Sequence, residues 1–418
     1  MANCPTCGTE LPENAQTCAA CGAELTPKPK KKKTGLVIGL VAAVLAVAAA
    51  AALLFCRPSG KTESASTDNT LFRHGLAAVM TEGRWGFVNT SGEYVARPIY
   101  DDVFPFQPCG RALVKLGDKW GFLAPDGTYA VEPQYEDAYP FDGGLAPVLV
   151  NGKWGCVDVN GKMVIEPAFD DPFFYSATGL TVFEADGKWG YLDMKGKIAI
   201  EPIFDDAYTF ASNGLAAVKV GDKEGYIDKS GKMVIQPQFD YAYGFESNGL
   251  AIVGVDDLFG AIDETGKFVI EPQFDSLFSF SDEGLAIVTV DGKDGVIDRA
   301  GNYVIEPKFE SLYTFSPNGL ALVWKDGKCG FVDKTGKYVI EPTFDDAYSF
   351  AANGLALVET DGLYGYIDAA GEFAIEPQFE DAFSFRDDGY AVVRADDLCG
   401  VIDSTGAFVI EPQFDYIY

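Results

Sequence analysis

The segment Leu320–Gly354 reads LALVWKDGKCGFVDKTGKYVIEPTFDDAYSFAANG, and this 35-residue pattern recurs through most of the 418-residue chain. One glycine of the pattern serves as a marker for each copy. The ten marker glycines are Gly86, Gly121, Gly155, Gly190, Gly225, Gly260, Gly295, Gly330, Gly365 and Gly400. Every step is 35 residues except the 34-residue step that ends at Gly155, and the matching proline and glycine series place this deletion between Pro133 and Gly144. We expect a loop there.

Each unit is expected to contain three strands. In the quoted copy these are Leu320–Trp324, Gly330–Asp333 and Tyr338–Glu341. Asp326-Gly327 suits a type I′ hairpin turn, in which both central residues have positive φ. Pro342 cannot donate to a β-ladder, so the third strand is expected to bend or bulge there.

The first strand of the unit is apolar on both faces, since Leu320 and Leu322 alternate with Ala321 and Val323. Such a strand must be covered on both sides, so successive units are expected to stack. The expected fold class is therefore an all-β array of ten three-stranded units, propeller-like, with an open β-superhelix or solenoid as the alternative. The apolar end, Phe414–Tyr418, favours a ring whose ends cover each other, although ten blades exceed the usual four to eight.

The repeats resemble those of bacterial WG-repeat proteins. The resemblance is carried by Lys119-Trp120-Gly121-Phe122, Lys153-Trp154-Gly155-Cys156 and Lys188-Trp189-Gly190-Tyr191, together with the recurring downstream Glu-Pro-x-Phe-Asp motif, and it covers Leu71 to Tyr418. It implies a β-repeat, propeller-like fold and brings no common biochemical activity.

The residue before the marker glycine differs strongly between copies. In chain order it is Trp85, Trp120, Trp154, Trp189, Glu224, Phe259, Asp294, Cys329, Tyr364 and Cys399. Because a buried, unpaired carboxylate is very unfavourable, Glu and Asp here predict a position that reaches solvent. An exposed tryptophan row in the first four units would then be a candidate ligand-binding site, for a sugar or a protein partner. The alternative is that each tryptophan packs over the neighbouring unit.

Carboxylates also recur after the third strand. They are Asp101-Asp102, Glu136-Asp137, Asp170-Asp171, Asp205-Asp206, Asp240, Asp275, Glu310, Asp345-Asp346, Glu380-Asp381 and Asp415. We expect them to cap backbone N–H groups, with Ca²⁺ binding as the alternative. No enzyme is expected: the only histidine, His74, occupies the turn position that holds Asn213, Asn248, Glu283 and Asn318 in other copies, and near-identical units single out no catalytic pair of carboxylates.

The first 26 residues predict a zinc ribbon. Cys4, Cys7, Cys18 and Cys21 form two C-x2-C motifs separated by ten residues, each followed by glycine. Four thiolates at this spacing fit one tetrahedral, structural Zn²⁺. The segment Asn3–Leu25 resembles the short zinc ribbon at the N-terminus of many bacterial membrane proteins; a disulfide-linked pair of loops is the alternative. The scattered cysteines Cys56, Cys109, Cys156, Cys329 and Cys399 share no spacing, and we expect no disulfide among them.

An apolar segment follows the zinc ribbon. Residues 36–56 are almost wholly apolar, and 21 residues in a helix span ~32 Å, enough for the hydrocarbon core. Five lysines in the basic segment 27–35 precede it, so the zinc ribbon is expected to be cytoplasmic and the repeats extracytoplasmic. A cleaved signal peptide, with Ala46-Val47-Ala48 as the processing site, is the alternative. Residues 57–70 are expected to be a flexible linker to the repeats, 71–418.

Charge is divided unevenly along the chain. Residues 1–70 hold seven basic and five acidic residues, whereas the rest holds 25 basic and 57 acidic. A surface this acidic repels phosphate backbones, so nucleic acid is not expected as a partner of the repeats. The sequence favours a single-pass membrane protein that presents a binding or scaffolding array to an envelope glycan or protein. The alternatives are a transmembrane sensor and, less favoured, a carboxylate-based glycan hydrolase.

Overall fold

The computed structural model describes residues 2–3, 10–11, 69–142, 144–174 and 178–418. The chain divides into two compact units, Met1–Pro58 and Ser59–Tyr418. In the first unit, strands β1 (Ala2–Asn3) and β2 (Glu10–Leu11) pair antiparallel. The four cysteines of the expected zinc ribbon and the apolar segment 36–56 lie outside the described residues. None of the residues that are described forms a helix long and apolar enough to cross a membrane.

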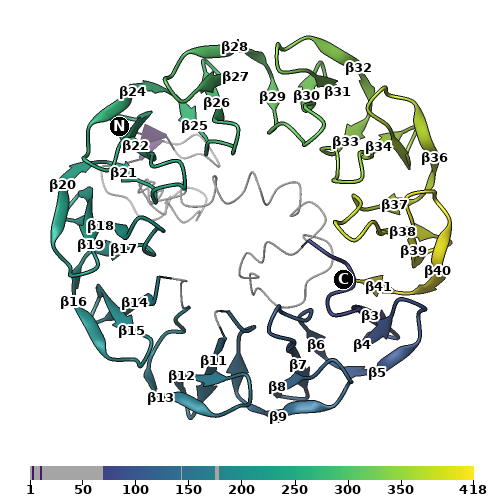
Figure 1. Ribbon diagram of the computed structural model, residues 1–418, viewed down its shortest axis with the longest axis horizontal. Helices are drawn as coiled ribbons and strands as arrows, with labels where there is room; N and C mark the ends of the chain where they lie inside the picture. The colour runs from purple at the N-terminus through teal and green to yellow at the C-terminus, as the bar shows by residue number, and fades with distance from the viewer. Residues whose placement is uncertain (1, 4–9, 12–68, 143, 175–177) are drawn as a thin grey trace. The chain divides into compact units, whose positions relative to one another are not determined.

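The second unit is a ring of ten small antiparallel sheets, which form the blades of a β-propeller (Figure 1). Each blade is a meander, and nine of the ten contain four strands. The first, or inner, strand has two residues. The inner strands are β6 (Asp102–Val103), β10 (Asp137–Ala138), β17 (Asp206–Ala207), β21 (Tyr241–Ala242), β25 (Ser276–Leu277), β29 (Ser311–Leu312), β33 (Asp346–Ala347), β37 (Asp381–Ala382) and β41 (Tyr416–Ile417).

The second and third strands of each blade form a tight hairpin. The second strands are β3 (Leu76–Thr81), β7 (Ala112–Leu116), β11 (Leu145–Val150), β14 (Leu180–Ala185), β18 (Leu215–Val220), β22 (Ala251–Val255), β26 (Leu285–Val290), β30 (Ala321–Lys325), β34 (Ala356–Thr360) and β38 (Ala391–Ala395). The third strands are β4 (Arg84–Asn89), β8 (Lys119–Leu123), β12 (Lys153–Asp158), β15 (Lys188–Asp193), β19 (Lys223–Asp228), β23 (Leu258–Ile262), β27 (Lys293–Asp298), β31 (Lys328–Val332), β35 (Leu363–Ile367) and β39 (Leu398–Ile402).

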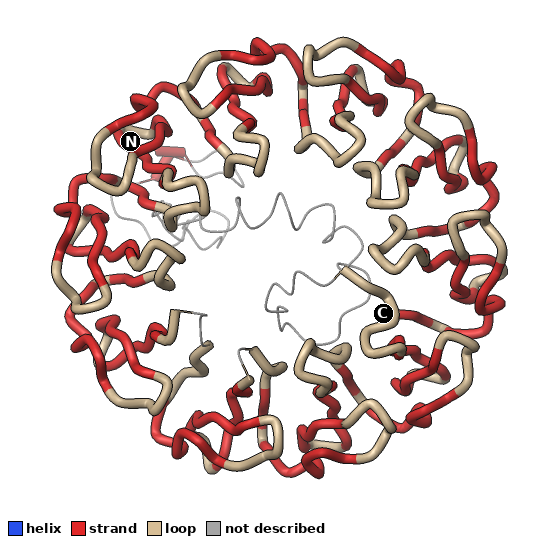
Figure 2. The backbone as a smooth tube through the Cα atoms, viewed as in Figure 1, coloured by secondary structure: helices blue, strands red, loops and turns tan. Residues whose placement is uncertain are grey.

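The fourth, or rim, strand has seven residues and follows the outer circumference of the ring (Figure 1). The rim strands are β5 (Tyr94–Tyr100), β9 (Tyr129–Tyr135), β13 (Met163–Phe169), β16 (Ile198–Phe204), β20 (Met233–Phe239), β24 (Phe268–Phe274), β28 (Tyr303–Phe309), β32 (Tyr338–Phe344), β36 (Phe373–Phe379) and β40 (Phe408–Phe414). The loops that precede the second strands face the centre of the ring (Figure 2).

The expectation of three strands per unit was wrong for nine of the ten blades, because the segment after the preceding rim strand forms their inner strand. Asp346 pairs with Glu359, for example, and Ala347 with Val358. The blade of β14–β16 has three strands. There Pro172 takes the place that Ala207 has in the next blade, and a proline has no N–H to donate.

The hairpin turns follow the sequence expectation. Asp326 and Gly327 have φ values of 51° and 76°, the positive pair that a type I′ turn needs. The bulge expected at the proline of the rim strand is present as well. Cys329 pairs with Phe344 and Phe331 pairs with Ile340, so the segment Glu341–Thr343 of the rim strand is looped out against a single residue, Gly330.

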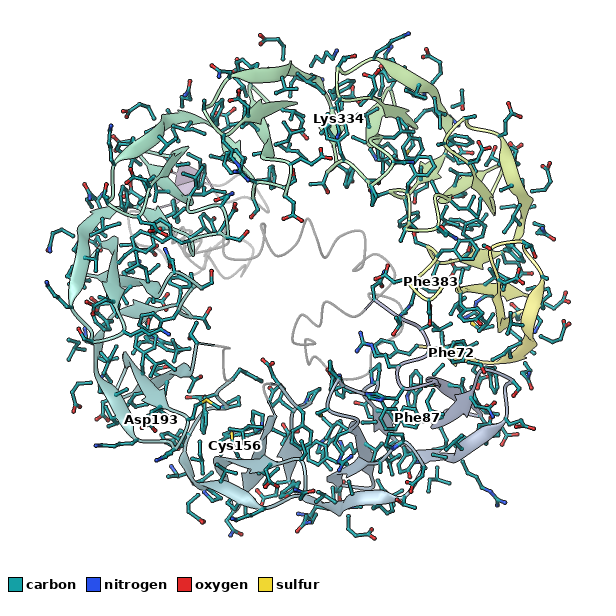
Figure 3. All side chains as sticks on the ribbon, viewed as in Figure 1. Phe72, Phe87, Cys156, Asp193, Lys334 and Phe383 are labelled. Carbon is teal, nitrogen blue, oxygen red and sulfur yellow. The ribbon has the colours of Figure 1, made fainter. Side chains whose placement is uncertain are left out.

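The core of the ring lies between and within the blades. The second strands are buried on both faces: the exposed fractions of Ala321, Leu322 and Val323 are 0, 4 and 0%. Aromatic and aliphatic side chains fill the blades around the whole ring, and Phe87 and Cys156 lie within this packing (Figure 3). The stacking of units expected from the two-sided apolar strand is therefore confirmed.

The ring is closed, which decides between the propeller and the open superhelix. The C-terminal strand β41 pairs with β3 of the first blade through Val79↔Ile417 and Met80↔Tyr416. The N–H of Asp415 donates to the carbonyl of Met80 at 2.9 Å, and the N–H of Tyr418 donates to that of Ala78 at 2.8 Å.

The seam has the contacts of an internal junction. At an internal junction between blades, the N–H of Asp345 donates to the carbonyl of Glu359 and the N–H of Tyr348 donates to that of Leu357, both at 2.9 Å. The rings of Tyr94 and Phe414 meet across the seam edge to face with centroids 6.1 Å apart, as do those of Phe309 and Tyr338 at an internal junction. The repeat contact is thus restored where the chain ends meet.

The chain entering the ring also contacts the last blade. The N–H of Asp387 donates to the carbonyl of Asn69 at 2.9 Å, and the N–H of Phe72 donates to the carboxylate of Asp388 at 2.9 Å. The ring of Phe72 meets that of Tyr390 edge to face at 5.3 Å. The seam is therefore held from both ends of the ring sequence.

Candidate functional site

The residue before the marker glycine points into the blade. The exposed fractions of Trp85, Trp120 and Trp154 are 7, 3 and 7%, and Trp189 is half-buried. Trp120 belongs to a core cluster that includes Ala138 and Phe141 of the next blade. The expectation that this position reaches solvent was wrong for Trp85, Trp120 and Trp154, which pack as the alternative described. Ligand binding by these four tryptophans stays a prediction, and the burial of three of them counts against it.

Glu224 shows why a carboxylate is tolerated at the same buried position. Its side chain is 6% exposed, and Oε2 accepts a hydrogen bond from the buried N–H of Ala242, in the inner strand of the next blade, at 2.6 Å. Burial raises the pKa of the Glu224 carboxyl, and the bond to Ala242 and the charge of Lys219 oppose that rise. The inference from charge alone failed because a buried carboxylate can be satisfied by a backbone donor.

Asp294 repeats this arrangement two blades further on. Its carboxylate accepts the N–H of Leu312 at 3.0 Å and the hydroxyl of Thr289 at 2.9 Å. Burial raises the pKa of the Asp294 carboxyl, and these two bonds oppose the rise. Both acidic members of the row therefore hold the second residue of the following inner strand.

In other blades the acceptor for the same N–H comes from the inner strand itself. The side chain of its first residue accepts the N–H of its second at 2.8 to 2.9 Å at Asp102, Asp137, Asp206, Asp346 and Asp381. Glu224 and Asp294 precede inner strands that begin with Tyr241 and Ser311, which carry no carboxylate. The acceptor has thus moved from one blade to its neighbour. The pairs Phe259 with Ser276 and Cys399 with Tyr416 carry no carboxylate at either position.

The marker glycine is required by the bulge in the rim strand. A Cβ built on Gly225 would lie 2.5 Å from the carbonyl oxygen of Ile235 and 2.7 Å from the nitrogen of Pro237. These are backbone atoms of the bulged segment and cannot move aside cheaply. The same approach to backbone atoms recurs at all ten marker glycines. The glycine of the Trp-Gly motif therefore packs directly against the backbone around the proline of the Glu-Pro motif.

In most blades the first carboxylate after the rim strand caps the next hairpin. Asp205 is an example: Oδ2 accepts the N–H of Gly221 at 2.7 Å, and Oδ1 pairs with the ammonium group of Lys188 at 2.6 Å. These contacts hold the pKa of Asp205 below its usual value, the bond to Lys188 contributing most. Similar caps are made by Asp101, Glu136, Asp240, Asp275, Asp345 and Glu380.

Capping by these acidic residues, expected from the sequence, is confirmed. The calcium alternative finds no matching geometry, because no group of three metal-ligating side chains is present among the residues that the structure describes.

Comparison with known families gives two matches. The model of the WG containing repeat matches residues 85–120, 120–154, 154–189, 189–223, 225–259, 259–293, 295–329, 330–364, 364–399 and 400–418. The chain belongs to the WG-repeat family. A zinc-ribbon domain matches residues 3–25. No curated protein matches the chain in sequence.

Solved structures resemble the WG-repeat ring only distantly. A eukaryotic initiation factor is 12% identical with a TM-score of 0.49, over 74% of this chain and 97% of that one. Apo AztD from Citrobacter koseri is 13% identical with a TM-score of 0.33, over 72% and 95%. Hsv2p of Kluyveromyces lactis is 10% identical with a TM-score of 0.31, over 54% and 89%. Similarity this low says nothing about function.

His74 and the cysteines of the WG-repeat ring complete the chemistry-bearing residues. His74 is a turn residue, as expected, with φ at 55°, and its Nε2 lies 3.0 Å from the carbonyl oxygen of Gln107, to which it donates. Cys156, Cys329 and Cys399 are buried, and burial raises the pKa of the thiols of Cys156 and Cys329 to about 12. Cys109 is exposed. The buried thiols are poor nucleophiles at neutral pH.

Proposed function

We propose that the WG-repeat ring is a binding or scaffolding module without catalytic activity. One observation carries this proposal: most of the polar side chains that recur from blade to blade hold the ring together, whereas the exposed turn residues differ from copy to copy. A rigid ring that presents variable turns is suited to recognising a partner. Its partner would be an envelope glycan or protein.

The proposal includes a membrane anchor. The apolar segment 36–56 would span the bilayer as one helix, and the lysines of residues 28–33 would keep the N-terminus in the cytoplasm. Cys4, Cys7, Cys18 and Cys21 would hold one structural Zn²⁺ there, in a segment that the zinc-ribbon match covers. The ring would then lie outside the cytoplasm.

A transmembrane sensor is the second candidate, and the seam of the ring favours it. The chain enters the ring at Asn69–Phe72, and this segment is bonded to Asp387 and Asp388 of the last blade. A ligand that changed the seam would therefore act directly on the chain that leads to the zinc ribbon. A glycan hydrolase is the weakest candidate, since most of the recurrent carboxylates cap hairpins.

The location of the ring can be tested with its exposed cysteine. In intact cells, a membrane-impermeant maleimide should label the full chain at Cys109, because the other three ring cysteines are buried. A Cys109→Ser variant should lose this label. Labelling that appears only after the cells are lysed would contradict an extracytoplasmic ring.

Binding can be tested with the full chain purified in a neutral detergent and immobilised. Solubilised envelope material and a glycan array should each be passed over it, and glycan products should be measured in the same samples. Retention of a defined glycan or protein without turnover supports a binding module. Product formation would favour the hydrolase, and retention of nothing would contradict the proposal.

A further inference from the structure

The two faces of the ring carry different turns. The hairpins between second and third strands reverse on one face, so the turns between third and rim strands lie on the other, because successive strands of each blade are antiparallel. We call these ten five-residue turns the turn face. They are residues 89–93, 124–128, 158–162, 193–197, 228–232, 263–267, 298–302, 333–337, 368–372 and 403–407.

Basic residues on the turn face are confined to six consecutive blades. The turns from 158–162 to 333–337 hold nine basic and seven acidic residues, whereas the other four turns hold no basic and five acidic residues. The nine, which we call the basic arc, are Lys162, Lys195, Lys197, Lys229, Lys232, Lys267, Arg299, Lys334 and Lys337.

The aspartates of these turns are engaged in the turns themselves. Oδ1 of Asp228 accepts the N–H groups of Ser230 and Lys232 at 2.9 and 3.1 Å, as well as the hydroxyl of Ser230. These bonds hold the pKa of Asp228 below its usual value, with the bond to the Ser230 side chain as the largest cause. The acidic member of the turn thus serves the backbone, and the lysine side chains remain at the surface.

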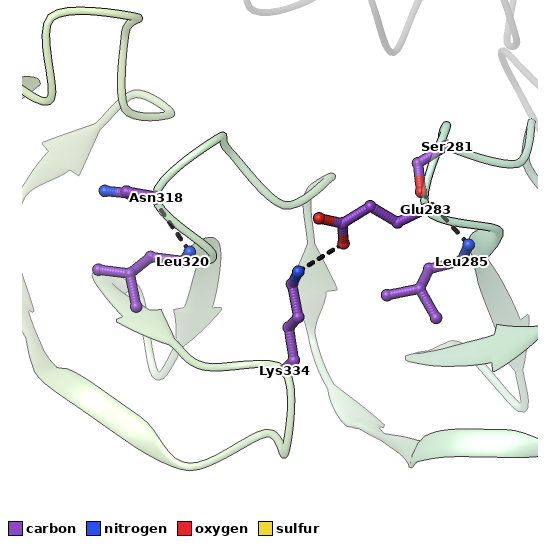
Figure 4. Close-up of polar contacts among 6 residues, drawn as sticks. All are labelled: Ser281, Glu283, Leu285, Asn318, Leu320 and Lys334. Atoms are coloured by element: carbon purple, nitrogen blue, oxygen red, sulfur yellow. Dashed lines mark hydrogen bonds and ion pairs between the residues drawn. The ribbon is translucent and has the colours of Figure 1, made fainter.

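Two members of the arc bond to the neighbouring blade, and a third contacts a loop of its own blade. The ammonium group of Lys334 lies 2.5 Å from the carboxylate of Glu283 (Figure 4), and that of Lys229 donates to the carbonyl of Thr178 at 3.0 Å. Arg299 lies against Gly284. The other six are exposed lysines that we take as the contact set: Lys162, Lys195, Lys197, Lys232, Lys267 and Lys337.

Five lysines of the opposite face lie close to carboxylates. Lys188, Lys223 and Lys328 each lie against the aspartate that caps the next hairpin, and Lys153 pairs with Asp170. Lys293 lies 3.9 Å from Glu310. A ligand approaching that face meets neutralised cations and the acidic hairpin turns, so the basic arc is the part of the ring that is suited to an anion.

We propose that the basic arc binds a linear polyanion whose charges are phosphate groups. Eight of the nine residues are lysine, which binds phosphate as a point charge and lacks the planar fork with which arginine recognises carboxylate or phosphate bidentately. The six turns contain no aromatic residue, so they offer no stacking platform for the bases of a single-stranded nucleic acid. The polymer is therefore held through its phosphates.

The shape of the arc favours a chain over a flat surface. A membrane laid on the turn face would also meet the acidic residues Glu93, Asp126 and Glu372 of the remaining blades, whereas a flexible chain can follow six blades and avoid them. The overall negative charge of the ring does not prevent this. At physiological ionic strength charges are screened beyond about 8 Å, so the lysines in contact dominate.

This inference concerns a surface that the proposed function does not specify, and it does not depend on the membrane anchor. Its test is a binding titration of fluorescent inorganic polyphosphate against three forms of the full chain. All three carry glutamine in place of Lys28 and Lys30–Lys33, so that this segment does not contribute. The parent form has no other change.

The arc variant has the six contact lysines changed to glutamine. The control variant has six lysines of the opposite face changed to glutamine: Lys119, Lys153, Lys188, Lys223, Lys293 and Lys328. Both therefore lose the same charge. We expect the parent and the control to bind polyphosphate similarly and the arc variant to bind at least about tenfold more weakly. Melting curves check folding, and a partial variant, Lys195→Gln with Lys197→Gln and Lys232→Gln, should be intermediate.

Competitors separate the possible sources of the anion. Polyglutamate, single-stranded DNA with the same number of phosphates, and anionic phospholipid vesicles are each added to the complex. Displacement best by unlabelled polyphosphate supports the proposal. The proposal would be overturned if the parent did not bind polyphosphate or if binding weakened equally in the arc and control variants. It would also be overturned if polyglutamate, DNA or vesicles competed more strongly than polyphosphate. A salt-sensitive self-association that depends on the arc would overturn it as well.

Discussion

The moved acceptor at Glu224 gives a quantitative prediction. In a Glu224→Ala variant the buried N–H of Ala242 has lost its acceptor at 2.6 Å. A buried donor left unsatisfied costs about 1 to 3 kcal/mol. Some of this is offset because the desolvation that raises the pKa of Glu224 is also removed. We therefore expect the free energy of unfolding to fall by about 1 to 2 kcal/mol.

A second substitution should restore the acceptor. Tyr241→Asp reproduces the arrangement seen at Asp206, whose carboxylate accepts the N–H of Ala207 at 2.8 Å. On its own it removes the stacking of Tyr241 on Phe259, whose ring centroids are 6.0 Å apart, at a cost of about 0.5 to 1.5 kcal/mol. In the Glu224→Ala background it should recover most of the loss.

The assay is a double-mutant cycle in urea, with unfolding followed by circular dichroism. We expect a coupling energy of about 1 to 2 kcal/mol between the two substitutions. Asp294→Ala with Ser311→Asp provides a matched second cycle, since Ser311 begins the inner strand that Asp294 holds. Strictly additive effects in both cycles would refute the reasoning, because the two side chains would then serve different groups.

Four further predictions concern single residues. Gly225→Ala should lower the free energy of unfolding by about 1 to 3 kcal/mol in urea melts, because the added Cβ meets the bulge. Gly244→Ala is the control and should be neutral or slightly stabilising, because a Cβ there has nothing within 4 Å and the φ of Gly244 is not positive. Equal losses in the two variants would refute the role of the bulge. Tyr226→Phe removes the hydrogen bond to the Tyr243 carbonyl at 2.6 Å and should cost about 1 kcal/mol in the same assay. Because the pKa of Glu224 is raised in the folded protein, the stability that this carboxyl contributes falls as the pH rises from the ordinary glutamate pKa through the raised one. In urea melts at several pH values, the free energy of unfolding of Glu224→Gln should therefore increase relative to that of the parent across this window. A difference that does not change with pH would contradict the raised pKa. Trp120→Ala should lower the free energy of unfolding by about 3 to 5 kcal/mol, because Trp120 is packed in the core. A melting temperature unchanged by this substitution would contradict the packing role and favour ligand binding by the tryptophans.

Local backbone conformation could be predicted from the sequence where a residue type allows only one conformation or pairing. Asp326-Gly327 has the conformation of a type I′ turn, and the proline of the Glu-Pro motif lies in a bulge, because both rest on backbone restrictions. The closed ring was favoured by the apolar end Phe414–Tyr418, which forms the seam with β3.

Other features needed the structure. The inner strand has only two residues and begins in the copy before its blade, so no periodic pattern shows it; it is visible only as pairing such as Asp346↔Glu359. Burial before the marker glycine was missed because an acidic residue there has two explanations, solvent or a backbone donor. The sequence does contain the compensating change, since the inner-strand position that holds Asp206 in one copy holds Tyr241 in the next. Comparing this position with Glu224 would have indicated that the Glu224 carboxylate bonds a backbone N–H of that inner strand.

Closure of the ten blades into a ring rests on the pairing of β41 with β3. It can be tested most directly by amide hydrogen exchange, because the seam has internal equivalents. The N–H groups of Asp415 and Tyr418 donate across the seam as those of Asp345 and Tyr348 do inside the ring. A closed ring predicts protection factors at the seam close to those of the internal pair. Rapid exchange at Asp415 and Tyr418, with Asp345 and Tyr348 still protected, would show an open array and contradict the account.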